Sequence, residues 1–308
     1  MNLIKELKEY KCLTNSTITI GVFDGVHLGH QKLISKVVEE SNNNQSLPIV
    51  ITFINHPASV LKKDFIPEFL CSLSQRIQLL EDLDIKQVIP ITFDKDVANL
   101  SAKHFIQLLQ DILKIKKMVI GPDFTMGHNR SGTNLTLPKL GSQMGFSVIS
   151  MQSVNDSSNY QISSTSIRQQ IKSGNMENAN SQLGRSFCLE GTVVKGMERG
   201  RTLGYPTANL QPSNINIVTP ADGIYATKTL VDGASYLSAT SIGTQPTFGE
   251  NTRTIESHLI NFSKNLYNKN ISIQFEKRIR GQKNFASVTE LQKQISKDVE
   301  ETQIILSN

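Results

Sequence analysis

The first half of the chain alternates short apolar runs with longer stretches of helical periodicity. The apolar runs are rich in β-branched residues, and helical patterns of roughly 10–15 residues separate them. This alternation predicts right-handed βαβ units and a parallel sheet, which binds ligands at the carboxyl ends of its strands. The predicted strands are residues 16–21, 48–53, 87–93, 117–121 and 146–151. Three helices are predicted: the first covers residues 27–40, the second is capped by Ser74 and ends near 83, and the third is capped by Ser101 and ends near 115.

The pattern changes after Gly184, where closely spaced β-like runs with turn signals such as Asp222-Gly223 replace the helical periodicity. Several short strands in succession predict a small antiparallel β-barrel, closed by a terminal helix over residues 287–305. We therefore expect an α/β domain over residues 1–183 and a β domain over 184–308. The predicted strands of the second domain are residues 224–231, 236–242, 254–262 and 271–279, with a further glycine-flanked strand within 191–196.

Composition fits two globular domains. The chain has 308 residues, of which 38% are hydrophobic and 19% charged. No apolar run reaches the roughly 18 residues of a membrane helix, and the N-terminus lacks a signal-peptide pattern. The three cysteines, Cys12, Cys71 and Cys188, are too widely spaced for a metal pair or a disulfide framework. We expect a cytoplasmic protein with no membrane partner.

The charge balance favours a small anionic ligand over nucleic acid. The net charge is +5 and the isoelectric point is about 9.0, but the 32 lysines and arginines are spread thinly. Tryptophan is absent and aromatic residues make up only 6%, so stacking platforms for bases are poorly supplied. A nucleotide is the simpler partner, nucleic acid is not expected, and self-association is left open.

The densest chemical signal is the string Gly21-Val-Phe-Asp-Gly-Val-His-Leu-Gly-His30, between a predicted strand and a predicted helix. Its glycines allow close approach of a ligand, and the start of a helix attracts phosphate. His27 and His30 are three residues apart, so in a first helical turn both imidazoles face one side and can hold phosphates. Two alternatives stay open: a plain strand–helix turn with capping histidines, and a zinc pair, which lacks a Cys or Glu at ligand spacing.

This string resembles the first nucleotide-binding motif of the bacterial bifunctional riboflavin kinase/FAD synthetase family. Three more segments of the first half are similar to that family's motifs. They are Thr52-Phe-Ile-Asn-His-Pro57, with Asn55 where proline is usual; Gly121-Pro-Asp-Phe-Thr-Met-Gly127 with Gly132, where Met126 replaces an aromatic residue; and Ile162-Ser-Ser-Thr-Ser-Ile-Arg168.

The resemblance implies a doubly wound nucleotidyltransferase domain that transfers AMP from ATP to FMN. It assigns catalytic roles to His27, His30 and Arg168. Alternatives are a plain N-cap at Ser164 or Thr165, a surface ion pair at Arg168 and a core position for Phe124. Asn55 lacks the fixed φ of proline, and Met126 offers contact without a stacking ring. The implied nucleotide-binding residues are Gly21, Phe23, Asp24, Gly25, Gly29, Ser163, Ser164 and Thr165, and the implied flavin-binding residues are Asn55, His56, Asp123, Phe124 and Gly127.

The second half resembles the riboflavin kinase of the same family. Gly200-Arg-Thr-Leu-Gly-Tyr-Pro-Thr-Ala-Asn209 carries its signature, and Ser241–Phe248 and Thr254–Leu259 also fit. Arg278-Ile-Arg280 precedes Phe285, but the usual acidic residue after the second arginine is missing. The resemblance implies nucleotide contacts at Gly196, Gly204 and Pro206, a flavin contact at Arg278, and Mg²⁺ ligands at Thr207 and Asn209.

A kinase step on riboflavin needs a base, because the ribityl 5′-hydroxyl must lose its proton as the bond to phosphorus forms. Glu256 matches the family's catalytic glutamate. Strand alternation predicts Glu256 and His258 on one face, with Ile255, Ser257 and Leu259 on the other. The alternative is an ordinary solvated strand carboxylate.

Together these features predict an enzyme that phosphorylates riboflavin with ATP and Mg²⁺, and then adenylates the FMN to give FAD and pyrophosphate. Two rivals remain. One is a monofunctional riboflavin kinase with an inactive or regulatory first domain, and the other is a non-enzymatic flavin-binding protein.

Overall fold

The computed structural model describes residues 2–154, 161–245 and 250–307. It divides into two compact units, each described separately below: unit 1 is Met1–Pro67 with Ser72–Ser163, and unit 2 is Glu68–Cys71 with Ser164–Asn308. The division lies before the predicted one at 183/184, because the intervening helix α9 (Met176–Leu183) packs against two barrel strands of unit 2. Where the two functional domains divide stays a prediction.

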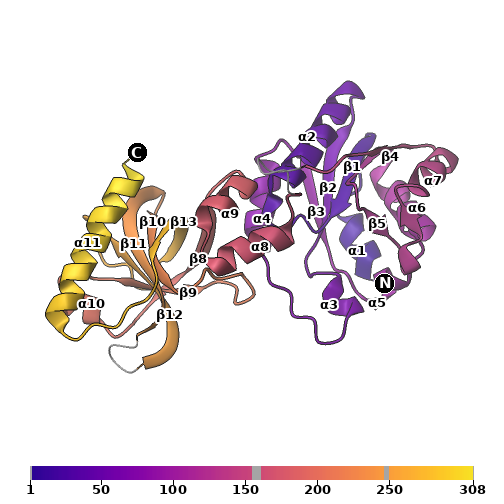
Figure 1. Cartoon of the computed structure of the whole chain (residues 1–308). Helices are drawn as coiled ribbons and strands as arrows, with labels where there is room; N and C mark the ends of the chain where they lie inside the picture. Colours follow the sequence, from indigo (N-terminus) through magenta and orange to yellow (C-terminus); the bar gives the residue numbers. More distant parts are fainter. Residues whose placement is uncertain (1, 155–160, 246–249, 308) are drawn as a thin grey trace. The chain divides into compact units, whose positions relative to one another are not determined.

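Unit 1 contains a five-stranded parallel sheet with the order β3-β2-β1-β4-β7 (Figure 1). Side chains on one face, among them Ile49 and Ile51, join a core with helices α1, α6 and α7. Val50 between them joins a second core with α2 and α4 on the other face. Burial on both faces confirms the doubly wound prediction. The strands are β1 (Ser16–Gly21), β2 (Leu47–Phe53), β3 (Gln87–Ile91), β4 (Ile115–Ile120) and β7 (Ser147–Ser150).

The helices of unit 1 include the three predicted ones and several shorter segments. Ser101 caps α6 as predicted, because its hydroxyl accepts from the His104 amide. The cap of α4 is Ser72 and not Ser74. The Ser72 hydroxyl accepts from the Gln75 amide, and the Gln75 side-chain oxygen accepts from the Ser72 amide, which together form a capping box. The bounds are α1 (Asn2–Lys8), η1 (Asp24–Val26), α2 (Leu28–Asn43), α3 (Ala58–Leu61), α4 (Leu73–Glu81), α5 (Lys95–Asn99), α6 (Ala102–Leu113), η2 (His128–Arg130) and α7 (Leu137–Met144), with a small ribbon of β5 (Thr125–Met126) and β6 (Gly132–Thr133).

The strand order creates a switch point beside β1. The chain runs from β1 through β2 to β3 on one side, and then crosses to β4 on the other side of β1. Because the strands are parallel, the segments that follow β1, β2 and β4 leave from the same edge. Ligands of doubly wound sheets bind at such an edge. The three motif segments of unit 1 therefore begin side by side.

Unit 2 is built on a closed barrel with the strand order β10-β11-β12-β9-β8-β13. The antiparallel pairings confirm the predicted small barrel, and α11 (Val288–Leu306) packs on β10, β11 and β13 behind its Ser287 cap. The strand β9 was not predicted, since it is short and ends on Pro212. The remaining bounds are α8 (Ser164–Ser173), β8 (Phe187–Val194), α10 (Arg199–Thr202), β9 (Ala208–Pro212), β10 (Gly223–Val231), β11 (Ala234–Gln245), β12 (Glu250–Leu259) and β13 (Asn270–Arg280).

Five hydroxyl side chains are fully buried inside the barrel, and they form hydrogen bonds with one another. The Thr240 hydroxyl donates to Ser257 over 3.0 Å, for example. Ser257 therefore points inward, and the neighbouring Glu256 points to the opposite side of β12. The five residues are Thr227, Thr229, Ser238, Thr240 and Ser257.

None of the helices in the described ranges combines the length and the apolar character needed to cross a membrane.

Gly127 provides a test of the loop that follows β4. Its φ is +74°, and a Cβ there would lie 2.3 Å from the backbone nitrogen of Ala102. We expect Gly127→Ala to lower the free energy of unfolding of unit 1 by about 1–2 kcal/mol for the left-handed backbone, plus ~1–3 kcal/mol for the collision. Gly145→Ala is the matched control, because Gly145 has a φ of +82° and open space around it. Urea unfolding followed by circular dichroism measures both, and equal losses would contradict the close packing at Gly127.

Candidate active sites

The Gly21–His30 segment turns the chain sharply between β1 and α2. Phe23 and Val26 adopt positive φ values of 50° and 40°, which is unusual for residues with side chains. His27 then caps α2, because its Nδ1 accepts from the His30 amide over 3.4 Å. Gly29 lies against this ring, and a Cβ there would be 3.2 Å from it. The turn thus places both histidines at the start of a helix.

The two imidazoles of this turn stack on each other. The ring centroids of His27 and His30 are 3.6 Å apart, with an interplanar angle of 18°, and the Phe23 ring meets His30 edge-on at 5.3 Å. Because Nδ1 of His27 accepts a hydrogen bond, the neutral ring carries its proton on Nε2. The Nδ1 atom of His30 is buried and has no hydrogen-bond partner among the described groups. The stacked rings thus place the unpartnered Nδ1 of His30 at the start of α2.

The pKa of His30 lies well below its usual 6.5, because burial disfavours the charged ring, and electrostatic interactions with His27 and Arg76 lower it further. His30 is therefore neutral at physiological pH. In the part of the chain that the structure describes, no three His, Cys, Asp or Glu side chains are grouped to hold a metal ion. The geometry gives the histidines an anion-binding character.

Asn55 follows β2, and its side-chain amide forms two hydrogen bonds with the backbone of Phe93, which follows β3. Its Nδ2 donates to the Phe93 carbonyl over 2.9 Å, and its Oδ1 accepts from the Phe93 amide over 2.9 Å. These two bonds fix the turn that proline would otherwise restrict. In the same loop, Nδ1 of His56 accepts from the Ala58 amide, and its ring lies 5.3 Å from that of Phe65.

The loop after β4 mixes core and exposed positions. Phe124 and Met126 pack partly against the core of unit 1, which supports the alternative reading of Phe124 as a packing residue. Asp123 is exposed and accepts from the Gln161 side chain over 3.3 Å. Gly127 turns the loop back onto α6 through its positive φ. Asp123 is thus the polar side chain that this loop offers at the carboxyl edge of the sheet.

The Ile162–Arg168 motif spans the division between the two units. Ser163 ends unit 1, while Ser164, Thr165 and Arg168 lie in α8 of unit 2. Because α8 begins at Ser164, the prediction of an N-cap at Ser164 or Thr165 is wrong, and both lie in the first helical turn. Unit 1 by itself thus brings together His27, His30 and the segments that follow β2 and β4.

The sequence reading missed Arg76, the largest fully buried side chain described. Its Nη1 donates to the Phe53 carbonyl over 2.9 Å and to the Thr52 hydroxyl over 3.3 Å. A signal was present, because Arg76 precedes Leu80 by four residues and therefore lies on the apolar face of α4. An arginine on such a face needs a polar partner inside the protein.

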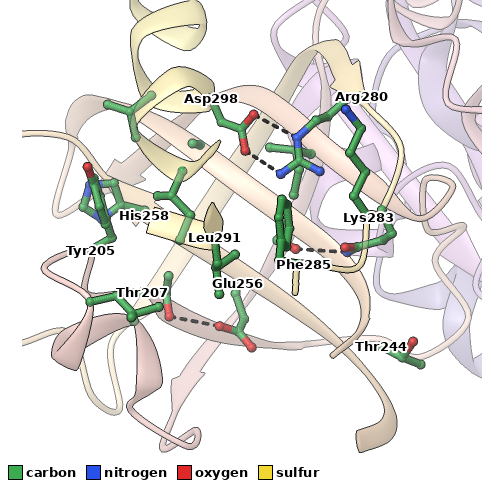
Figure 2. Close-up of a pocket in the computed structure, with 18 residues that line it drawn as sticks. Tyr205, Thr207, Thr244, Glu256, His258, Arg280, Lys283, Phe285, Leu291 and Asp298 are labelled. Atoms are coloured by element: carbon green, nitrogen blue, oxygen red, sulfur yellow. Dashed lines mark hydrogen bonds and ion pairs between the residues drawn. The ribbon is translucent and has the colours of Figure 1, made fainter. Parts of the chain in front are cut away.

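A cavity in unit 2 contains the candidate phosphoryl-transfer site (Figure 2). Glu256 lines it and accepts from the Thr207 hydroxyl over 3.0 Å and from the Thr254 hydroxyl over 3.1 Å. The predicted alternation along β12 is confirmed: Glu256 and His258 are partly exposed, while their neighbours Ile255, Ser257 and Leu259 are buried. The carboxylate is thus held from two sides and faces the cavity.

The segment around β9 places further oxygen atoms close to the Glu256 carboxylate. Asn209 is the register partner of Glu256, and its amide lies against Gly196, where a Cβ would be 2.3 Å from Nδ2. The Pro206 carbonyl accepts from Nδ1 of His258 over 2.8 Å. Hydroxyl, amide and carboxylate oxygens in one place suit a hard cation such as Mg²⁺. Gly204 turns the preceding loop with a φ of +84° and open space around it.

Arg280 lines the cavity, whereas Arg278 is not among its lining residues. A bulge places Arg278 opposite Tyr225 and Arg280 opposite Ile224, and Arg278 donates to the Asp222 carbonyl over 2.6 Å. Such bulges redirect side chains, so the two arginines do not share one role.

Arg280 is paired with Asp298 of α11, a partner that the sequence reading missed (Figure 2). The bonds are 2.9 Å from Nε to Oδ1 and 2.6 Å from Nη2 to Oδ2, and the guanidinium lies 5.9 Å from the Phe285 ring centroid. The side chains are only 12% and 5% exposed. The partner of the second arginine is thus an acid of the terminal helix, 18 positions further along the chain.

Comparison with known proteins identifies both halves of the chain. Residues 9–166 match the family model described as FAD synthetase, and residues 183–306 match that described as riboflavin kinase. The bifunctional riboflavin kinase/FMN adenylyltransferase of Escherichia coli K12 is 36% identical over 91% of this chain and 90% of its own length. The protein of the same description from Bacillus subtilis 168 is also 36% identical, over 100% of this chain and 96% of its own length. A crystal structure described as the macrolide-efflux protein from Streptococcus pneumoniae superposes with a TM-score of 0.88 at 29% identity, over 95% of each chain.

Proposed function

The chain belongs to the family of bifunctional riboflavin kinases/FMN adenylyltransferases, and on this premise we propose how its two sites work. The barrel of unit 2 phosphorylates riboflavin with ATP, and the site at the edge of the unit 1 sheet transfers AMP from ATP to the resulting FMN, giving FAD and pyrophosphate. The observation that carries the proposal is the carboxylate of Glu256, held by Thr207 in a cavity beside Asn209.

In the kinase step, the ribityl 5′-hydroxyl attacks the γ-phosphorus of ATP. Glu256 accepts the hydroxyl proton, and ADP leaves. The hydrogen bonds from Thr207 and Thr254 orient the carboxylate toward the cavity. Thr207 and Asn209 would hold Mg²⁺, which would offset the negative charge of the ATP phosphates.

In the adenylyl step, an oxygen of the FMN phosphate attacks the α-phosphorus of ATP, and pyrophosphate leaves. A phosphate with a second pKa near 6 is ionised at neutral pH, so no base is needed. The requirement is to bring two anions together and to stabilise the charge on the α-phosphate. The stacked His27 and His30 at the start of α2 supply N–H donors for this purpose.

The proposal is tested by incubating the protein with riboflavin, ATP and Mg²⁺ and separating the flavins by chromatography. We expect FMN to form first and FAD to follow, with ADP and pyrophosphate as the other products. FMN without FAD would identify a monofunctional kinase, and no turnover with bound flavin would identify a carrier. We also propose a cytoplasmic location, which is supported by the reduced state of Cys12, Cys71 and Cys188, none of which forms a disulfide.

Removal of the divalent cation gives a further prediction. We expect a chelator to stop FMN formation and excess Mg²⁺ to restore it. Thr207→Val should raise the Mg²⁺ concentration for half-maximal kinase rate by about 10-fold or more, because it removes an oxygen ligand. Thr192→Val is the control, since the Thr192 hydroxyl bonds to Asn270 and does not line the cavity. An unchanged Mg²⁺ dependence in Thr207→Val would remove Thr207 from the metal site.

A further inference from the structure

The buried acidic, basic and histidine side chains of unit 1, within its described residues, all belong to elements at one edge of the sheet. They are Asp24 in η1, His27 at the start of α2 and Arg76 in α4. Helix α4 packs directly against η1, and both elements belong to the core that covers this face. Burying charge is costly, so such groups tend to be kept where a site uses them. Arg76 is the buried base among them to which neither the family resemblance nor the proposed mechanism assigns a role.

Arg76 links the ends of two neighbouring strands. Its guanidinium donates to the Phe53 carbonyl and the Thr52 hydroxyl at the carboxyl end of β2. The Thr52 hydroxyl in turn donates to the Val22 carbonyl over 3.0 Å, just after β1. Val22 lies inside the turn that presents His27 and His30. The chain of bonds therefore runs from α4 to the base of the histidine turn.

The charge of Arg76 reaches the same histidines. Burial, His27 and Arg76, in that order, lower the pKa of His30. Because Arg76 is only 1% exposed, little water or salt screens its field. Arginine also stays protonated in any protein environment, which suits a permanent buried charge. A polyphosphate held by the histidine turn would lie within this field.

We propose that Arg76 is a positioning residue for adenylyl transfer: its buried guanidinium fixes the ends of β1 and β2 beneath His27 and His30 and directs a permanent positive charge toward the bound triphosphate. The inference rests on the proposed function of unit 1. At 1% exposure the side chain does not touch substrate, so it acts through the histidine turn and through its field.

The alternative is a structural pin that only stabilises unit 1. The removal of a pin lowers stability but leaves kcat and the KM for ATP of the folded protein unchanged. The test therefore measures the His30 pKa by NMR of the imidazole protons, assigned with a His30→Gln spectrum. It also measures kcat and KM for ATP in FAD formation from FMN.

Arg76→Met removes the charge and keeps a long side chain. We expect its kcat/KM for ATP to fall by about 10²-fold, the usual result of misplaced catalytic groups, and the His30 pKa to rise. Arg76→Lys keeps the charge and should retain the low His30 pKa and much of the ATP affinity. Lys103→Met, at an exposed position on α6, is the matched control and should behave as the unaltered protein.

Thr52→Val provides a second route, because it breaks the link to Val22 without removing the charge. We expect it to lower kcat for FAD formation while the His30 pKa stays low. If Arg76→Met does not fold, Thr52→Val decides, and unaltered adenylation by Thr52→Val overturns the proposal. A folded Arg76→Met with adenylation within twofold of the unaltered protein also overturns it. Failure of the unaltered protein to form FAD would instead refute the proposed function of unit 1.

Discussion

Glu256→Gln is expected to lower the riboflavin kinase rate by about 10²–10⁴-fold, the usual effect of removing a positioned base. Glutamine keeps the shape, and its single amide oxygen can accept from one of the two threonine hydroxyls while its Nε2 donates to the other, but it does not take the proton of the 5′-hydroxyl. Because the loss arises in the transition state, binding of riboflavin and ATP should change little. Initial rates of FMN formation and equilibrium titration of riboflavin fluorescence measure the two effects.

The same variant should still adenylate FMN that is supplied directly, because a phosphate dianion needs no base. Glu190→Gln is the matched control: Glu190 also lies on a barrel strand and accepts from the Ser272 hydroxyl, but it does not line the cavity. Near-normal phosphorylation by Glu256→Gln would show that the carboxylate is an ordinary strand residue. The proton acceptor would then be the phosphoryl group or a bound water.

His30→Ala is expected to reduce FAD formation from FMN by about 10²–10³-fold, the usual cost of removing one donor to transition-state charge. The neutral imidazole stacks on His27 and has a buried Nδ1 without a partner among the described groups. The substitution therefore removes both a donor and the support of the His27 ring. FMN formation from riboflavin should be unchanged, since the kinase residues lie in unit 2.

His104→Ala is the control for this effect, because His104 is exposed on α6 of the same unit. It should leave both reactions intact. His30→Gln tests the donor role separately, since its amide keeps an N–H group without the ring. Equal loss of both reactions in a folded His30→Ala protein would contradict the assignment of two independent sites.

The sequence predicted the architecture well, because an element that buries one face repeats its apolar residues with the period of a strand or a helix. The strand at 16–21 was predicted with its observed bounds, and alternation placed Glu256 on the cavity side of β12. The cap of α4 was misassigned to Ser74 although the signal was local: Ser72 is followed three residues later by Gln75, the pattern of a capping box. The strand β9 was missed because its pairing with β8 and β12 comes from distant residues.

The sequence by itself determined the two-part fold, the motif segments and the face on which Glu256 lies, since each depends on residue type and on spacing along a single element. Only the tertiary structure decided which charges are buried and how they are paired. Arg76 meets Thr52 across 24 positions, and Arg280 meets Asp298 across 18. A bulge directs Arg280, and not Arg278, into the cavity. Periodicity reports which face of an element is buried, whereas a buried charge also needs a partner, and the packing of separate elements supplies that partner.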